Sequence, residues 1–239
     1  MKSREYLIDV FKDTTEKVES GKYRDYLKSE KVNFDTINVE SEYYRFNVSV
    51  VNEDCVETAR ILSKEGKTCM LNMASHKRPG GGVKSGAMAQ EEELARRSNL
   101  MWGLKEEYYP ISETQFIYTY DVDFFKDSMY NEINPFTCDV ITIPAVNISV
   151  GKPSNYKYLM TEKIENILSY PHLKGCKNLV LSAFGCGVFK NDPNYVANLF
   201  KELIYTKYGG LYDNIIFSII NDRNSVGSNY QIFKDVLLN

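Results

Sequence analysis

Short apolar stretches recur along the chain at intervals that suit strands separated by helices. These stretches combine β-branched or aromatic residues with flanking turn formers, a combination typical of strands. Several are continuously apolar, as expected for strands covered on both faces. The predicted strands span residues 46–51, 68–74, 115–120, 140–146, 179–184 and 215–220.

Between the strands, apolar positions follow the spacing of amphipathic helices. Asp54 begins a capping box that predicts the start of a helix at residue 55. Pro193 suits the first turn of another helix, with Asn191 or Asp192 as its cap. The predicted helices span residues 4–20, 55–64, 91–108, 156–169, 193–208 and 229–237.

This alternation of strands and helices predicts a three-layer α/β sandwich. The chain has 239 residues, of which 43% are hydrophobic and 26% charged, so it can bury a substantial core. No Pro/Gly/Ser-rich linker or internal repeat interrupts the sequence. We therefore expect a single domain over residues 1–239, with residues 1–45 as an N-terminal helical extension packed on it.

Charge and cysteine content narrow the possible classes of protein. The net charge of −3, without basic stripes interleaved with aromatic residues, argues against direct nucleic-acid binding. No apolar run has the length of a membrane span, and the first residues lack the apolar stretch of a signal peptide. The 5 widely spaced cysteines and 2 histidines match neither a disulfide framework nor a metal site. We expect a cytoplasmic protein without a metal or other cofactor.

Three consecutive glycines, Gly80, Gly81 and Gly82, stand between a predicted strand and a predicted helix. Glycines at such a transition let backbone N–H groups approach an anion, and the helix N-terminus adds partial positive charge. The segment matches neither a Walker A loop nor GxGxxG. The alternative is a flexible surface turn.

Three glutamates follow this loop and occupy the first turn of the predicted helix. There they favour the helix dipole, and Glu92–Arg96 and Glu93–Arg97 are potential i,i+4 pairs. A solvated helix start would explain all of them. The functional alternative requires one carboxyl in a cleft, as in glycosidic cleavage. A helix N-terminus lowers a carboxyl pKa, whereas burial beside a bound diphosphate raises it.

A second glycine-containing loop follows the strand predicted at 179–184. Two such loops at strand ends can form one crevice. The loop consists of Gly185, Cys186, Gly187, Val188 and Phe189. Cys186 as a nucleophile would need a histidine base, but His76 and His172 lie in no recognisable motif. We favour a structural role for this cysteine.

The three glycines, seven intervening residues and Gln90-Glu91-Glu92 together resemble the signature of the microbial-type poly(ADP-ribose) glycohydrolases, a branch of the macrodomain superfamily. The segments VVNEDCVETAR, LNMASHKRPGGG, AQEEELARRS and SAFGCGVFKNDP also resemble this family, in the same order. The resemblance covers about residues 50–200. It implies an α/β/α macrodomain with a central mixed, mostly parallel sheet and extra N-terminal helices.

The resemblance also implies roles for the residues of the first loop. Glu92 would protonate the ribose–ribose oxygen and then activate water, while Glu91 would hold the ribose hydroxyls. The three glycines and Gln90 would shape the catalytic loop, and Asn72 would bind the proximal ribose.

Further implied roles fall on the second loop and on Asp54. Residues Gly185 to Phe189 would cradle the diphosphate through backbone N–H groups, with Phe189 packing on the ribose or adenine. Asp54 would recognise adenine, although its capping role is equally well supported. Glu93 is expected to be a surface residue of the helix.

The expected function is hydrolysis of poly(ADP-ribose) on modified proteins to ADP-ribose, by a monomer that does not contact a membrane. One alternative is hydrolysis of mono-ADP-ribosyl groups or ADP-ribose esters. Another is a non-catalytic macrodomain that reads ADP-ribose. The intact Gln-Glu-Glu favours an enzyme, since a reader has no need of two adjacent carboxylates.

Overall fold

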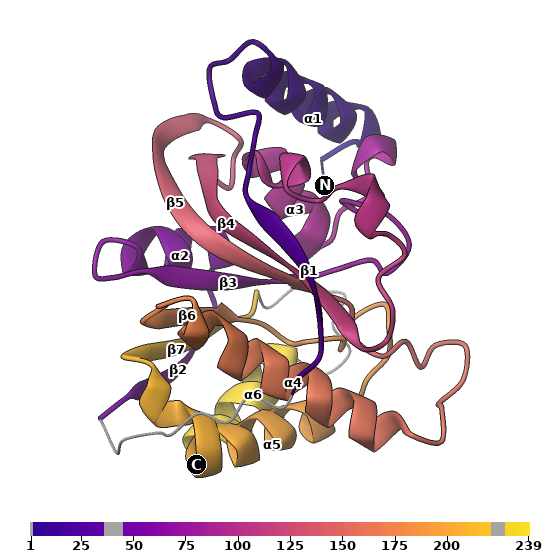
Figure 1. Ribbon diagram of the computed structural model, residues 1–239, viewed down its shortest axis with the longest axis vertical. Coiled ribbons are helices and arrows are strands. Elements are labelled where there is room, and N and C mark those ends of the chain that lie inside the picture. Colours follow the sequence, from indigo (N-terminus) through magenta and orange to yellow (C-terminus); the bar gives the residue numbers. More distant parts are fainter. Residues whose placement is uncertain (1, 36–44, 221–227) are drawn as a thin grey trace. The chain divides into compact units, whose positions relative to one another are not determined.

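A computed structural model of the protein describes residues 2–35, 45–220 and 228–239. Its strands are β1 (Ser29–Asn33), β2 (Asn47–Val51), β3 (Thr68–Met73), β4 (Gln115–Lys126), β5 (Glu132–Ile143), β6 (Asn178–Leu181) and β7 (Asn214–Ser218). They form a seven-stranded sheet in the order β1-β4-β5-β3-β6-β7-β2 (Figure 1). The sheet is mixed, as predicted: β2–β7, β3–β6 and β6–β7 pair in parallel, and β4–β5 antiparallel.

The chain divides into two compact units, which are described separately. Unit 1 comprises Met1–Val32 and Asn72–Pro144, and unit 2 comprises Asn33–Leu71 and Ala145–Asn239. Strand β3 contributes to both, because the division falls between Leu71 and Asn72. Within the described residues, no helix combines the length and the apolar character needed to cross a membrane.

Unit 1 contains the helices α1 (Arg4–Glu19) and α3 (Gln90–Arg97) beside the β4–β5 hairpin (Figure 1). Ser3 caps α1 by accepting the Tyr6 N–H at 3.1 Å. The two helices share an apolar cluster that includes Phe11 and Ala95.

A buried arginine also joins these helices. Arg96, 0% exposed, donates from Nε to the Leu7 carbonyl at 3.1 Å, and the Thr14 hydroxyl donates to the Arg96 carbonyl. Since a buried guanidinium must be hydrogen-bonded, α1 is an integral support of α3.

Two sequence predictions in unit 1 are wrong in extent. The helix predicted over residues 91–108 ends at Arg97, because Ser98 is extended and forms a β-bridge with Phe124. Two 3-10 helices follow, η2 (Leu100–Trp102) and η3 (Glu106–Tyr108), and η1 (Val83–Ser85) precedes α3. The N-terminal extension, expected to be helical, also contains the unpredicted strand β1 and partly lies outside the described residues.

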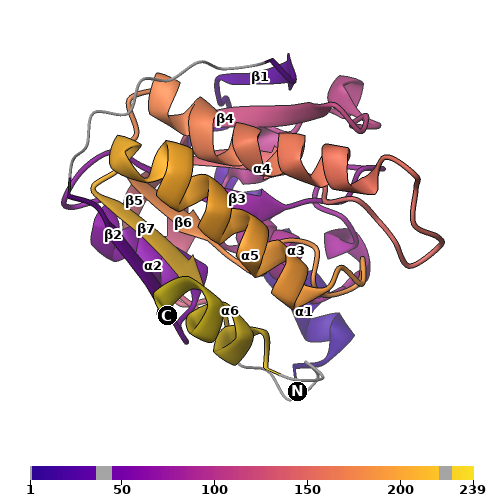
Figure 2. The ribbon, with the colours of Figure 1, turned by 90° about the horizontal axis from the view of Figure 1, so that it is seen from below.

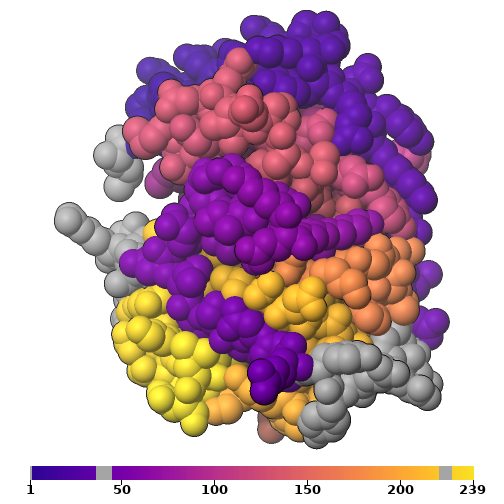
Figure 3. Space-filling model, turned by 90° about the vertical axis from the view of Figure 1, so that its left-hand side faces the viewer, coloured from indigo at the N-terminus to yellow at the C-terminus, as the bar shows by residue number. Residues whose placement is uncertain are grey.

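Unit 2 contains α2 (Cys55–Leu62), α4 (Tyr156–Leu173), α5 (Pro193–Leu203), α6 (Asn229–Leu238), the π-helix η4 (Ile204–Tyr208) and the 3-10 helix η5 (Gly209–Leu211). Helices α4 and α5 lie side by side (Figure 2). On the face shown in Figure 3, the edge strand β2 and α2 (purple) reach the surface, with α6 (yellow) beside β2. Every residue of β6 is buried, as its continuous apolar sequence predicts.

Candidate active site

The polar side chains at the start of α3 bind the backbone of the residues that precede the helix. Gln90 Oε1 accepts the Met73 N–H at 2.9 Å, and Glu91 Oε2 accepts the Ser75 N–H at 2.7 Å. Glu92 accepts two N–H groups, from Gly82 at 2.8 Å and from Ala89 at 2.9 Å. These bonds satisfy backbone donors that a loop would otherwise leave unpaired. The three residues therefore fix the glycine loop against the helix.

The glycines of the loop are required by both conformation and space. Gly80 and Gly81 have φ values of +63° and +55°, in the left-handed region. A Cβ on Gly81 would lie 2.5 Å from Glu92 Oε1 and 2.9 Å from Glu91 Oε2. Gly81 thus lies directly against both carboxylates. The glycine loop is an ordered part of the site, and a flexible surface turn does not explain it.

Substituting Gly81 by Ala is expected to destabilise the protein by more than the backbone strain of an alanine at this positive φ. The added methyl group would displace one of the two carboxylates, and such overpacking typically costs about 1–3 kcal/mol. Gly21→Ala is the matched control, since Gly21 has φ +78° and nothing within 4 Å of its Cβ position. Urea denaturation of both variants measures the difference, and equal losses of stability would contradict the close packing at Gly81.

The buried polar atoms of unit 1 that lack a hydrogen-bond partner among the described residues include Asn72 Oδ1, Glu91 Oε1 and Tyr109 Oη. Asn72 is 0% exposed and donates its amide to Thr142 Oγ1 at 3.2 Å, and Glu91 is 4% exposed. Buried polar atoms without partners are costly, and they concentrate at functional sites. The three atoms are therefore candidates for ligand contacts.

Tyr109 was not predicted from the sequence. The Ile111 N–H donates to the His76 carbonyl at 2.9 Å, which holds this segment beside Ser75, the residue that binds Glu91. Burial, with an additional contribution from the Glu91 carboxylate, raises the pKa of Tyr109 well above its ordinary value. Its hydroxyl therefore keeps its proton and can act as a donor.

Burial also changes the protonation of Glu91. It raises the pKa of Glu91 to about 8, and the negative charge of Glu92 adds to the increase, while the Ser75 N–H opposes it. At neutral pH, Glu91 therefore retains its proton. Perturbed carboxyl pairs of this kind are typical of catalytic sites.

Glu93 is not the plain surface residue that was expected. Both of its carboxylate oxygens accept the Tyr130 hydroxyl, at 2.8 and 2.9 Å, and Oε1 pairs with Arg96 at 3.2 Å. The Arg96 pairing is i,i+3 with Glu93, instead of the predicted i,i+4 with Glu92. Glu93 therefore supports α3, and it faces away from the glycine loop that binds Glu92.

The second loop, in unit 2, is braced by Asn191. Its Nδ2 donates to the carbonyls of Val146 and Gly185 at 2.9 and 3.0 Å, and its Oδ1 accepts the Tyr156 hydroxyl at 2.8 Å. Gly185 has φ +74°, and a Cβ there would lie 2.5 Å from Asn191 Nδ2. Asp192 caps α5, which leaves Asn191 to shape the loop.

The other residues of this loop lie nearer the surface. Gly187 and Val188 are exposed, Cys186 and Phe189 are half-buried, and the Phe189 carbonyl accepts the Ile148 N–H at 3.1 Å. Burial, with Asp192 adding to it, raises the pKa of Cys186 to about 12. The thiol thus stays protonated, which weakens the nucleophile alternative.

Asp54, also in unit 2, performs the capping role predicted from the sequence. Its Oδ1 accepts the N–H groups of Val56 and Glu57 at 3.0 and 3.1 Å at the start of α2.

The predicted site residues thus form two groups. Unit 1 brings together Asn72, Gly80, Gly81, Gly82, Gln90, Glu91 and Glu92. Unit 2 holds the loop from Gly185 to Phe189, and it also holds Asp54 at a separate helix start. Sequence reasoning missed Tyr109 and the bracing role of Asn191.

Comparison with known proteins identifies the family of the chain. The family model of the microbial-type PARG catalytic domain matches residues 11–127. A mutant poly(ADP-ribose) glycohydrolase (PARG) from Deinococcus radiodurans, crystallised with ADP-ribose, has 30% sequence identity and a TM-score of 0.72. The match covers 80% of this chain and 84% of that one. The chain belongs to the microbial-type poly(ADP-ribose) glycohydrolase family.

The fold of this PARG family member also resembles more distant structures. PARG from Thermomonospora curvata aligns with a TM-score of 0.86 at 23% identity, over 97% of this chain and 99% of that one. The same enzyme bound to the inhibitor ADP-HPD aligns with a TM-score of 0.83 at 24% identity, over 96% and 98%. A search among curated proteins gives no match. The family resemblance seen in the glycine and glutamate signature is therefore confirmed.

Proposed function

We propose that the protein hydrolyses the ribose–ribose O-glycosidic bonds of poly(ADP-ribose) and releases ADP-ribose. The observation that carries this proposal is the pair Glu91–Glu92, held by the glycine loop within a PARG fold. The two carboxyls differ in environment, since Glu91 keeps its proton at neutral pH. Glycosidic cleavage requires a carboxyl that protonates the leaving oxygen and can then act as the base that assists the water.

In the proposed reaction, Glu92 protonates the leaving ribose oxygen as the glycosidic bond breaks. The sugar passes through an oxocarbenium-like state. Glu92 then accepts a proton from water, whose oxygen bonds to the anomeric carbon. This returns the site to its starting state.

The neighbouring groups would position the ribose. Glu91 Oε1, Asn72 Oδ1 and Tyr109 Oη are buried and have no hydrogen-bond partner in the described part of the chain, so sugar hydroxyls are suitable partners for them. A neutral Glu91 can both donate and accept such bonds. Gln90 and Gly80–Gly82 would hold the loop that carries these contacts.

Roles in unit 2 are also proposed. The N–H groups of the loop from Gly185 to Phe189 would bind the diphosphate, because glycine-rich turns present several donors at once. Phe189 would pack on ribose or adenine. Asp54 would contact adenine while it also caps α2. We further propose that residues 1–239 act as a single catalytic domain and that the protein is a cytoplasmic monomer acting on ADP-ribosylated proteins.

Incubation with defined substrates tests the proposal. We expect the protein to release free ADP-ribose from poly-ADP-ribosylated protein and to leave the last, protein-linked unit in place, because that unit lacks a ribose–ribose bond. Release of mono-ADP-ribose or hydrolysis of an ADP-ribose ester, with the polymer intact, would favour the alternative hydrolase. Binding of ADP-ribose without cleavage of any substrate would favour a reader.

A further inference from the structure

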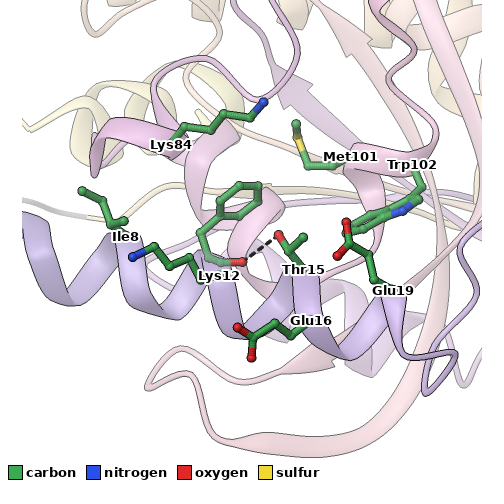
Figure 4. A pocket seen from close by; sticks show the side chains of 9 residues that line it. Ile8, Lys12, Thr15, Glu16, Glu19, Lys84, Met101 and Trp102 are labelled. Atoms are coloured by element: carbon green, nitrogen blue, oxygen red, sulfur yellow. Dashed lines mark hydrogen bonds between the residues drawn. The ribbon is translucent and has the colours of Figure 1, made fainter.

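A cavity of unit 1 lies between α1 and the short helices η1 and η2, away from Glu91 and Glu92. Its volume is about 550 Å³. Helix α1 forms one wall, and Lys84, Met101 and Trp102 form the other (Figure 4). We refer to this cavity as the α1 pocket. None of the residues assigned to the reaction lines it.

The lining of the α1 pocket combines a flat apolar surface with cations. Phe11, Met101 and Trp102 offer two rings and a thioether, which are suitable for stacking a base. Lys12 and Lys84 lie toward one end of the pocket, Glu19 lies beside Trp102 at the other, and Glu16 lies on α1 between them (Figure 4).

The two lysines are available to an anionic ligand. Within the described part of the chain, no carboxylate pairs with Lys84, which is exposed. Lys12 pairs with Asp9 at 3.3 Å, but both side chains are largely exposed, so this pair contributes little. A diphosphate could therefore engage both ammonium groups. Glu19 could accept hydrogen bonds from ribose hydroxyls, although its charge would oppose a phosphate placed at that end.

The α1 pocket adjoins a smaller cavity beside the glycine loop. This loop pocket has a volume of about 360 Å³ and is lined by Arg78, Gly81 and Gly82 together with Lys84 and Met101. The last two residues line both cavities. Since Gly82, which lines the loop pocket, donates to Glu92, the loop pocket lies close to the carboxylate pair.

We propose that the α1 pocket binds a second ADP-ribose unit of the same polymer chain whose bond is cut beside Glu92. The neighbouring unit would extend along the loop pocket over Lys84 and Met101, with its base against Trp102 and its diphosphate at Lys12 and Lys84. This inference rests on the proposed function. It adds a polymer-specific site, because two linked sites bind a chain more tightly than either site alone.

The single tryptophan of the chain provides a direct readout. In a Glu92→Gln background, which prevents cleavage, short ADP-ribose oligomers should change Trp102 fluorescence and bind about 100-fold more tightly than monomeric ADP-ribose. The double variant Lys12→Glu/Lys84→Glu should lose most of this advantage. The charge-matched control Lys64→Glu/Lys157→Glu changes two exposed lysines that line neither cavity and should retain it.

The outcomes separate this inference from the proposed function. If oligomers bind no more tightly than monomer, or if the Lys12/Lys84 double variant keeps the full advantage, the α1 pocket is not a polymer site. Cleavage of polymer by the wild-type protein would leave the proposed function intact in that case. A wild-type protein that neither binds ADP-ribose nor cleaves polymer would overturn both.

Discussion

Replacing Glu92 by Gln is expected to reduce poly(ADP-ribose) cleavage by about 10²–10⁴-fold, the range typical for loss of a general acid–base group. Glutamine keeps the size of the side chain and one acceptor oxygen, which serves one of the two N–H groups, because Gly82 and Ala89 donate to different oxygens of Glu92. It cannot deliver a proton to the leaving oxygen. Release of ADP-ribose measures the effect, and calorimetric titration with ADP-ribose should give an affinity close to that of the wild type.

Glu93→Gln is the matched control for this prediction. Glu93 belongs to the same acidic run, but its carboxylate binds Tyr130 and Arg96. We expect cleavage within a few-fold of wild type, together with a loss of about 1 kcal/mol of stability from the weakened pair. If Glu93→Gln abolished cleavage while Glu92→Gln did not, the catalytic assignment would be displaced by one residue.

The second large effect is on stability and concerns Glu91. Its pKa is about 8 in the folded protein and would be near 4.5 in an unfolded chain. Between these values the native state holds a proton that the unfolded state has lost, so this group makes the protein less stable as pH rises. Each pKa unit corresponds to about 1.4 kcal/mol. The contribution of neutral Glu91 to the stability is thus complete below pH 4.5, and it is lost progressively as the pH rises to about 8.

Glu91→Gln should remove this dependence. We expect the stability of the variant, relative to wild type, to increase by about 2–3 kcal/mol between pH 5.5 and 7.5, as measured by urea denaturation. Glu65→Gln, at an exposed position after α2, serves as the control and should follow the wild type at both pH values. A difference between Glu91→Gln and wild type that does not change with pH would mean that Glu91 is ionised in the folded protein.

The sequence predicted most of the fold because its strands are strongly apolar and its helices carry recognisable caps. Asp54 and the Asp192–Pro193 pair illustrate this, since each starts the helix that its pattern indicates. Strand β1 was missed because its sequence, SEKVN, holds a single apolar residue and no alternation. The predicted 91–108 helix was too long because the bridge between Ser98 and Phe124 is a tertiary contact, which helical spacing does not reveal.

The site was predictable to the extent that it depends on local sequence. The glycine triplet and Gln90-Glu91-Glu92 lie within a few residues of each other, and both the conformation and the function of the segment follow from them. Tyr109 lies in an irregular segment, and the bond between the Ile111 N–H and the His76 carbonyl, which helps to hold this segment beside Ser75, is a tertiary contact that the sequence does not reveal. The raised pKa of Glu91 depends on its burial in the folded chain, whereas three adjacent glutamates look equivalent in sequence.

The contact between Arg96 and the carbonyl of Leu7 has an evolutionary consequence. A fully buried guanidinium that lost this acceptor would be strongly destabilising. We therefore expect that a relative that has lost the N-terminal helix carries an uncharged residue in place of this arginine. Because the arginine follows Glu91 and Glu92 by only a few positions, the presence of α1 and the identity of that residue should be inherited together. A homologous sequence truncated before β2 but retaining the arginine would be a fragment with impaired folding.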